Sequence, residues 1–186
     1  PIYLPTGRIV FTSTREPKYI QCNKHISANL YAMDADGANV HQIARSALFE
    51  DHACLMPDGR ILYSRWEYVD RNFGDAQGLW TCDPTGTGHA IYYGNNTSSP
   101  GGVLDGRPIP GTQAIVCTFS SCHDRPWGAI AILDRRLGVD GPDPVMHIWP
   151  SHTKSWIRVL NHVDTSYDQF VYCNPKYEDP YPLVDP

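Results

Sequence analysis

Three adjacent residues, Cys122, His123 and Asp124, carry a thiol, an imidazole and a carboxylate, all of which bind first-row metal ions. Neighbouring side chains of an extended chain point to opposite sides, so such a triplet seldom chelates by itself. Cys22 and His25 are separated by two residues, which gives a loop enough slack to bring both to one ion. One interpretation is therefore a composite zinc site made of these five residues. The structural alternative, which we favour, is that Asp124 caps a turn and His123 bonds to the backbone.

A second group of side chains could line a binding face. A run that begins at Arg65 alternates charged and aromatic residues, and an arginine presents a fork of donors suited to anions. The same run could equally form a salt-bridged clasp between structural repeats. Asp51 and His52 precede an apolar strand pattern and could face a central channel, although a single histidine is more often hydrogen-bonded than ligating. The residues that we assign to this face are Asp51, His52, Arg65, Trp66, Glu67, Arg125 and Trp127.

Composition excludes several classes of function. The net charge of −5 provides no basic footprint for nucleic acid, and no apolar run approaches the ~18 residues that a membrane span requires. The chain has neither a Gly-x-Ser-x-Gly elbow nor a Cys-x-x-Cys pair, so it matches neither the serine hydrolases nor a zinc knuckle. Of the six cysteines, Cys54, Cys82 and Cys117 fall within strand patterns, where we expect buried thiols.

The elements that position these residues come from a repeat of roughly 50 residues. Each copy has an apolar strand, a tight turn at Gly7, Gly59 or Gly111, a second strand, a long polar loop and a hairpin. Four short strands per repeat are typical of β-propeller blades. We predict an all-β chain that forms a single partial propeller, with three four-stranded antiparallel blades and the first strand of another, taken from a ring of six or seven. The expected ranges are about 1–45, 51–94 and 103–149 for the blades, 150–178 for a long connection and 179–186 for the start of the next blade.

A propeller places its loops on two faces. The Gly turns would lie on one face, and the long connections over residues 15–27, 66–77 and 121–127 would lie on the other. Long loops on a rigid scaffold commonly carry binding and catalysis. The prediction that residues 22, 66 and 122 lie at the same end of the molecule follows from this arrangement.

Particular segments resemble known families. The Asp-Ala-Asp-Gly and Pro-Asp-Gly-Arg turns resemble the blade repeats of TolB-type and WD40-like propellers. The segments MPDGRILYSRWEYVDR (56–71), SCHDRPWG (121–128) and YEDPYPL (177–183) together resemble the propeller domain of hydrazine synthase alpha-subunit-like proteins of planctomycetes and related bacteria. Asn23 follows Cys22 at a position where an aspartate would strengthen the zinc interpretation.

This resemblance implies a propeller that lies between other domains of an exported, periplasmic or extracellular bacterial protein. It implies an oxidoreductase centre with zinc and a c-type haem, the haem being held outside this segment, which has no Cys-x-x-Cys-His. The expected partners are other domains of the same parent chain, a protein or a small ligand. The alternative is a TolB-like protein-interaction propeller with no metal or catalytic role. The chain opens within a motif, so we expect it to be a piece of a longer protein, with any signal peptide upstream.

Overall fold

The structure, a computed structural model, describes residues 1–20, 24–68, 77–159 and 166–183. Its regular structure is mainly antiparallel β-sheet, and the helices of the described part are short 3₁₀ helices. These are η2 (Arg135–Leu137), η3 (Ser151–Trp156) and η4 (Ser166–Tyr172). None of the helices in the described part is long and apolar enough to cross a membrane. The all-β prediction is confirmed.

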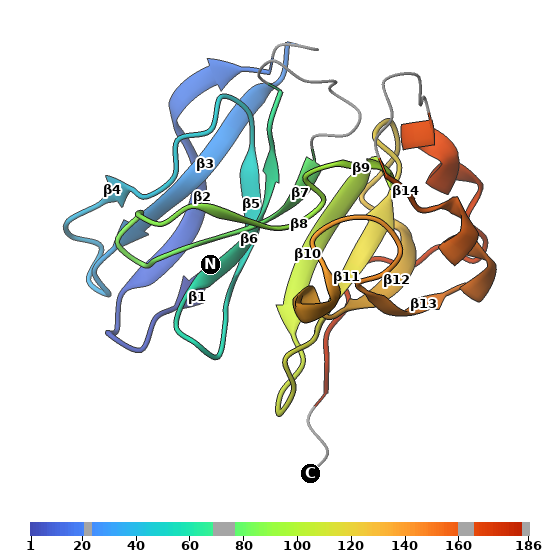
Figure 1. Ribbon diagram of the computed structural model, residues 1–186. Helices are drawn as coiled ribbons and strands as arrows, with labels where there is room; N and C mark the ends of the chain where they lie inside the picture. Colours follow the sequence, from blue (N-terminus) through green and yellow to red (C-terminus); the bar gives the residue numbers. More distant parts are fainter. Residues whose placement is uncertain (21–23, 69–76, 160–165, 184–186) are drawn as a thin grey trace.

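Twelve of the strands form three antiparallel meanders that follow one another along the chain (Figure 1). Meander 1 consists of β1 (Ile2–Tyr3), β2 (Ile9–Tyr19), β3 (Ile26–Met33) and β4 (His41–Gln42). Meander 2 consists of β5 (Glu50–Leu55), β6 (Ile61–Trp66), β7 (Gln77–Cys82) and β8 (Ala90–Tyr93). Meander 3 consists of β10 (Gly102–Pro108), β11 (Ile115–Ser120), β12 (Gly128–Leu133) and β13 (Val145–Trp149). A parallel contact between Gly102 and Gln77 joins meanders 2 and 3, and β9 (Thr97–Ser99) pairs with β14 (Arg158–Val159).

Each of the three predicted blade ranges holds one meander, whereas one predicted loop differs from the structure. The connection over 15–27 is shorter than predicted, because β2 continues to Tyr19 and β3 begins at Ile26 after an irregularity that follows Ser13. Residues 150–178, the predicted long connection, include η3, β14 and η4. Residues 178–183 have no ladder partner among the described strands, and residues 184–186 lie outside the described part, so the start of a further blade stays a prediction. That the meanders are propeller blades is likewise a prediction.

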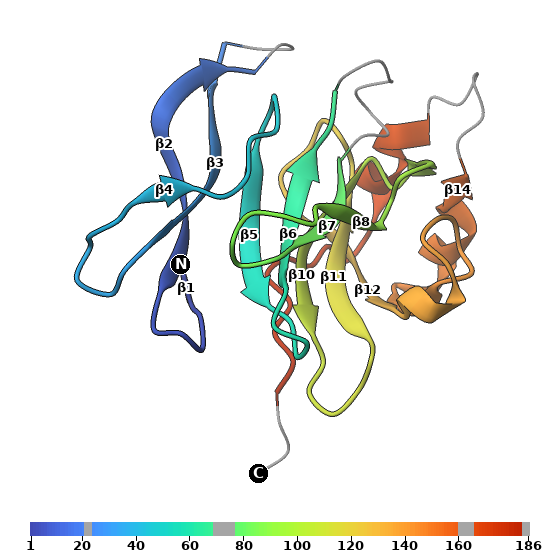
Figure 2. The ribbon, with the colours of Figure 1, turned by 60° about the vertical axis from the view of Figure 1, so that its left-hand side comes forward.

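The tight turns lie together at one end of the sheets. Figures 1 and 2 show the β1–β2, β5–β6 and β10–β11 turns at the lower end, whereas β2, β6 and β11 end, and β3, β7 and β12 begin, toward the upper end. Glycine is required in these turns because Gly7, Gly59 and Gly111 have φ values of 81°, 88° and 74°, which side chains with a Cβ rarely adopt. The predicted separation of short and long connections is therefore present.

Two apolar cores lie between consecutive meanders, because side chains alternate between the two faces of each sheet. Ile61 and Tyr63 of β6 pack against meander 1, whereas the intervening Leu62 packs against meander 3. The fully buried side chains of the first core include Val10, Leu30, Ile61 and Tyr63. Those of the second core include Leu62, Leu79, Ile115 and Phe119. Meander 2 is thus covered on both faces.

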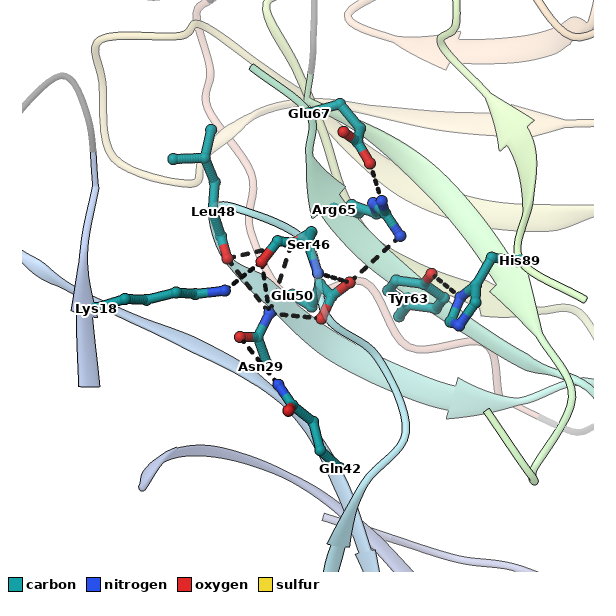
Figure 3. A network of polar contacts seen from close by, with 10 residues as sticks. All are labelled: Lys18, Asn29, Gln42, Ser46, Leu48, Glu50, Tyr63, Arg65, Glu67 and His89. Atoms are coloured by element: carbon teal, nitrogen blue, oxygen red, sulfur yellow. Dashed lines mark hydrogen bonds and ion pairs between the residues drawn. The ribbon is translucent and has the colours of Figure 1, made fainter. Parts of the chain in front are cut away.

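A buried polar network ties meander 1 to meander 2 (Figure 3). The Glu50 carboxylate is fully buried and accepts hydrogen bonds from Asn29 Nδ2 at 2.6 Å and from the Ser46 backbone N–H at 3.1 Å. It also pairs with the Arg65 guanidinium at 3.4 Å, and Arg65 pairs in addition with Glu67. Since a buried carboxylate is costly without such partners, this network fixes how the two meanders meet.

We expect Glu50→Gln to lower the free energy of unfolding by about 3 kcal/mol, the scale on which breaking a buried ion pair destabilises a protein. The new amide would leave Arg65 without this counter-charge and would place an N–H₂ group near the donors of Asn29 and Ser46. Urea denaturation at pH 7 measures the loss. The control is Asp58→Asn, which removes the exposed pair with Arg60 and should cost about 1 kcal/mol or less. Equal losses in the two variants would contradict the role of Glu50.

Candidate functional site

A cleft of about 340 Å³ opens at the end of the sheets that carries the long connections. Asp51 and His52 of β5 contribute to its lining, together with Trp66 at the end of β6 and Gln77 at the start of β7. Residues 120–124, which end β11 and begin the connection to β12, form another part of the lining. Its walls therefore come from strands and connections of meanders 2 and 3, with Ile20 added from meander 1.

The cleft gathers most of the residues that the sequence indicated. Those that line it are Asp51, His52, Trp66, Cys122, His123 and Asp124. Arg65 pairs instead with Glu50 and Glu67, both within meander 2, and this group reaches meander 1 through the Asn29–Glu50 hydrogen bond, so a salt-bridged clasp between repeats stays a prediction. Arg125 lies outside the lining, with its guanidinium 4.6 Å from the centre of the Trp127 ring and 3.5 Å from Glu178. His25 is exposed and does not line the cleft, and Cys22 lies outside the described residues.

His52 lies in a bulge of β5 and has a φ of 49°. Its Nδ1 is 2.8 Å from Asp51 Oδ1. This hydrogen bond raises the pKa of His52; burial opposes the rise, and the charges of Asp51, Asp105 and Asp179 add to it. Asp105 occupies the corresponding bulge of β10, where burial raises the pKa of its carboxyl group. His52, which lines the cleft, thus interacts electrostatically with Asp105 and Asp179.

His123 is held by Asp168, a residue that the sequence analysis missed. One Asp168 oxygen lies 2.7 Å from His123 Nδ1, and the other accepts the His123 backbone N–H at 2.9 Å. A carboxylate on Nδ1 fixes the orientation and the tautomer of an imidazole, as in many metal and catalytic sites. Asp168 lies in η4, far along the chain, and no spacing signal could have paired it with His123. The structural interpretation had expected a backbone partner for this ring, and the partner is a carboxylate.

Asp124 caps the start of its connection, as the structural interpretation predicted. Its Oδ1 accepts the Arg125 N–H at 2.8 Å, and its Oδ2 lies 2.5 Å from Lys176 Nζ. Burial tends to raise the pKa of Asp124, but the hydrogen bond from Lys176 and other favourable contacts outweigh it, so the pKa lies below its usual value. Lys176, like Asp168, had no sequence signal.

Cys122 differs from the other cysteines of the described part, because it alone is not fully buried. Its Sγ accepts a hydrogen bond from Gln77 Nε2 at 3.2 Å. Burial raises the pKa of Cys54 and Cys82 to about 12 and also raises that of Cys117, so these thiols are inert, as the strand pattern predicted.

A metal site is not formed by the described residues alone. No three His, Cys, Asp or Glu side chains in the described ranges lie close enough together to hold an ion. His25, Cys122, His123 and Asp124 therefore do not make up a zinc site by themselves. The composite site that includes Cys22 stays a prediction.

Comparison with protein-family models, curated proteins and solved structures gives no match to this chain. The resemblance noted in the sequence is therefore a basis for proposals and not an assignment of family.

We expect the protein to lose stability as the pH rises through the pKa of folded His52. That pKa is raised, so the stabilisation is fully present below the unfolded value near 6.5 and disappears above the folded value. Urea unfolding between pH 5.5 and 8.5 measures the slope. His52→Asn should flatten it, because asparagine tolerates a positive φ but carries no charge. The exposed His152 provides the control, since His152→Asn should leave the slope unchanged. A slope that persists in His52→Asn would assign the effect to another group.

Proposed function

We propose that the three meanders are consecutive blades of a β-propeller and that the segment from Asp179 begins another blade. The supporting observation is one backbone conformation that recurs at one position of the repeat. His52, Asp105 and Asp179 have φ values of 49°, 49° and 52°. Each precedes by four residues the apolar residue that the repeat aligns, namely Met56, Ile109 and Leu183.

A left-handed conformation is uncommon for residues other than glycine, so three occurrences at the same position of the repeat are more than chance would give. The first two lie in the bulges of β5 and β10, which are the first strands of meanders 2 and 3. Cys54 Sγ donates to the Gly106 carbonyl at 3.0 Å and links these two strands just after their bulges. Asp179 has the same backbone conformation as His52 and Asp105, which supports a strand path like that of β5 and β10 for the residues that follow it.

The faces of the sheets support the same arrangement. Leu62 and Leu79 lie on the face of meander 2 that meander 3 covers, and both are fully buried. Val116 and Ile130 occupy the same ladder positions in meander 3. Over that face runs the segment 177–183, and an apolar groove of about 360 Å³ lies between them. A further blade would cover this face as meander 3 covers Leu62 and Leu79.

In this proposal the chain is a scaffold and binding module, and the cleft at the end with the long connections is its binding site. The resemblance extends the proposal to an exported bacterial protein similar to the hydrazine synthase alpha subunit, in which this end docks a ligand or a haem- or zinc-bearing centre held by other domains. The second candidate is a metal-free interaction platform of the TolB type. It is favoured by the partners that Cys122, His123 and Asp124 already have in Gln77, Asp168 and Lys176.

We expect Asp179→Gly to keep the segment 177–183 in place and Asp179→Val to release it, because valine is disfavoured at a φ of 52°. Hydrogen exchange measures the release at the Tyr177 N–H, which donates to the Gly128 carbonyl at 2.7 Å. The matched control is Glu178→Val, a change at the preceding exposed residue, which should leave the exchange rate unaltered. Equal protection in both Asp179 variants would remove the support that this residue gives to a further blade.

Zinc analysis tests whether this segment forms a metal centre by itself, which neither candidate function expects. We expect the purified chain to hold much less than one zinc ion, with no change in Cys122→Ala, since the candidate ligands are engaged elsewhere. Plasma mass spectrometry after dialysis gives the stoichiometry. One zinc per chain that disappears in both Cys22→Ala and Cys122→Ala would instead show a metal centre within this segment.

A further inference from the structure

We propose that the cleft binds a neutral saccharide of one or two rings, held by hydrogen bonds and by packing on an apolar wall. This inference rests on the proposed function, because it takes the cleft to be the binding site of the module. It names the chemical class of the ligand, which the fold by itself does not indicate.

The size of the cleft limits the ligand to a small molecule. Ligand sites commonly measure about 300–1,000 Å³, and the volume here is about 340 Å³. The cleft is therefore at the lower end of the range, where one or two sugar rings fit but a long chain does not.

Charge pairing within the lining favours a neutral ligand. Asp51 pairs with His52 at 2.8 Å, and Asp124 pairs with Lys176 at 2.5 Å. The remaining titratable ring of the lining, His123, pairs with Asp168 at 2.7 Å. An anion or an amine would have to compete with a partner already in place, whereas a neutral ligand leaves these pairs intact.

The polar groups of the lining are numerous and of mixed type. Carboxylate oxygens of Asp51 accept hydrogen bonds, the Gln77 amide both donates and accepts, and the Ser121 hydroxyl, which donates to the Asp168 carbonyl at 3.0 Å, can accept a further one. Sugar hydroxyls also donate and accept, so they can satisfy such a set in many geometries. A purely apolar ligand would leave the remaining hydrogen-bonding capacity of these groups unused.

The apolar part of the lining provides a wall for a ring. Phe49 is half-buried and lies against Trp66, with ring centres 5.8 Å apart and ring planes at 50°. Leu104 and Pro126 add further apolar surface to the cleft. A pyranose has a face of C–H groups that can pack on such a wall while its hydroxyls reach the polar groups, and this pairing of apolar and polar surfaces is the feature that selects a saccharide.

The test is a titration of the whole chain, ¹⁵N-labelled, with glucose, galactose, mannose, cellobiose and maltose, followed by amide and side-chain NMR shifts. We expect at least one sugar to shift the Gln77 side-chain amide and the Ser121 backbone amide. Glucuronate and glucosamine, the charged counterparts of glucose, should bind at least tenfold more weakly than the neutral sugar. Tighter binding of either charged sugar would overturn the inference.

The variant Gln77→Leu should weaken binding of the neutral sugar at least tenfold, and Asp51→Asn, which keeps the size of the side chain, provides a second test of the same wall. The matched control is Gln113→Leu, an exposed residue at the end with the tight turns, which should leave affinity unchanged. Thermal unfolding verifies that each variant is folded. Unchanged affinity in both cleft variants would overturn the site.

The same titration separates this inference from the proposal on which it rests. If none of the sugars shifts a cleft resonance but uncharged aromatic fragments such as indole do, the cleft binds ligands and the saccharide inference is wrong. If neither the sugars nor the fragments shift these resonances, the cleft is not a small-molecule site; the saccharide inference then fails together with the proposal that this cleft binds a small ligand.

Discussion

The arrangement of the molecule depends on a middle sheet that is buried on both faces. In β6, consecutive residues Ile61, Leu62 and Tyr63 are all fully buried, because odd positions face one neighbouring meander and the even position faces the other. Burial of such side chains contributes roughly 1.5–3 kcal/mol each, so neither neighbour can separate without a large loss. Since neighbouring meanders cover both faces of this sheet, a binding site on it can form only at the two ends of its strands, where the connections lie.

The two ends of the sheets differ in polarity, and this difference explains where the cleft lies. Toward the tight turns the strands contribute apolar side chains such as Ile61 and Ile115. Toward the long connections they contribute buried polar ones, among them Asn29, Glu50 and Ser120. Such groups are tolerated only when they are hydrogen-bonded, and Glu50 shows how fully that requirement is met. The cleft lies at this end, where the polar groups are already positioned by partners within the fold.

The sequence was sufficient for the repeating strands and for half of the site. Apolar runs and glycine turns located the three meanders, because both signals are local. The same approach was wrong for residues 15–19, which extend β2 with mostly exposed side chains and of which Lys18 and Tyr19 pair with β3. In the cleft, Asp51, His52 and Cys122 had local signals, whereas Asp168 and Lys176 reach His123 and Asp124 from segments about fifty residues away. Such long-range partners carry no spacing that a single sequence can show.

The left-handed residues connect this architecture to the chemistry of the cleft. A residue with a Cβ in that conformation costs of order 1 kcal/mol, and it persists when the surrounding structure requires it. Glycine would adopt the same backbone with less strain, yet the chain has an imidazole at 52 and carboxylates at 105 and 179. The charges of both carboxylates raise the pKa of His52, while Asp179 also raises the pKa of Asp105, so the three groups titrate under one another's influence. His52 and Asp51 line the cleft, so the left-handed residue of β5 belongs both to the repeat and to the cleft wall.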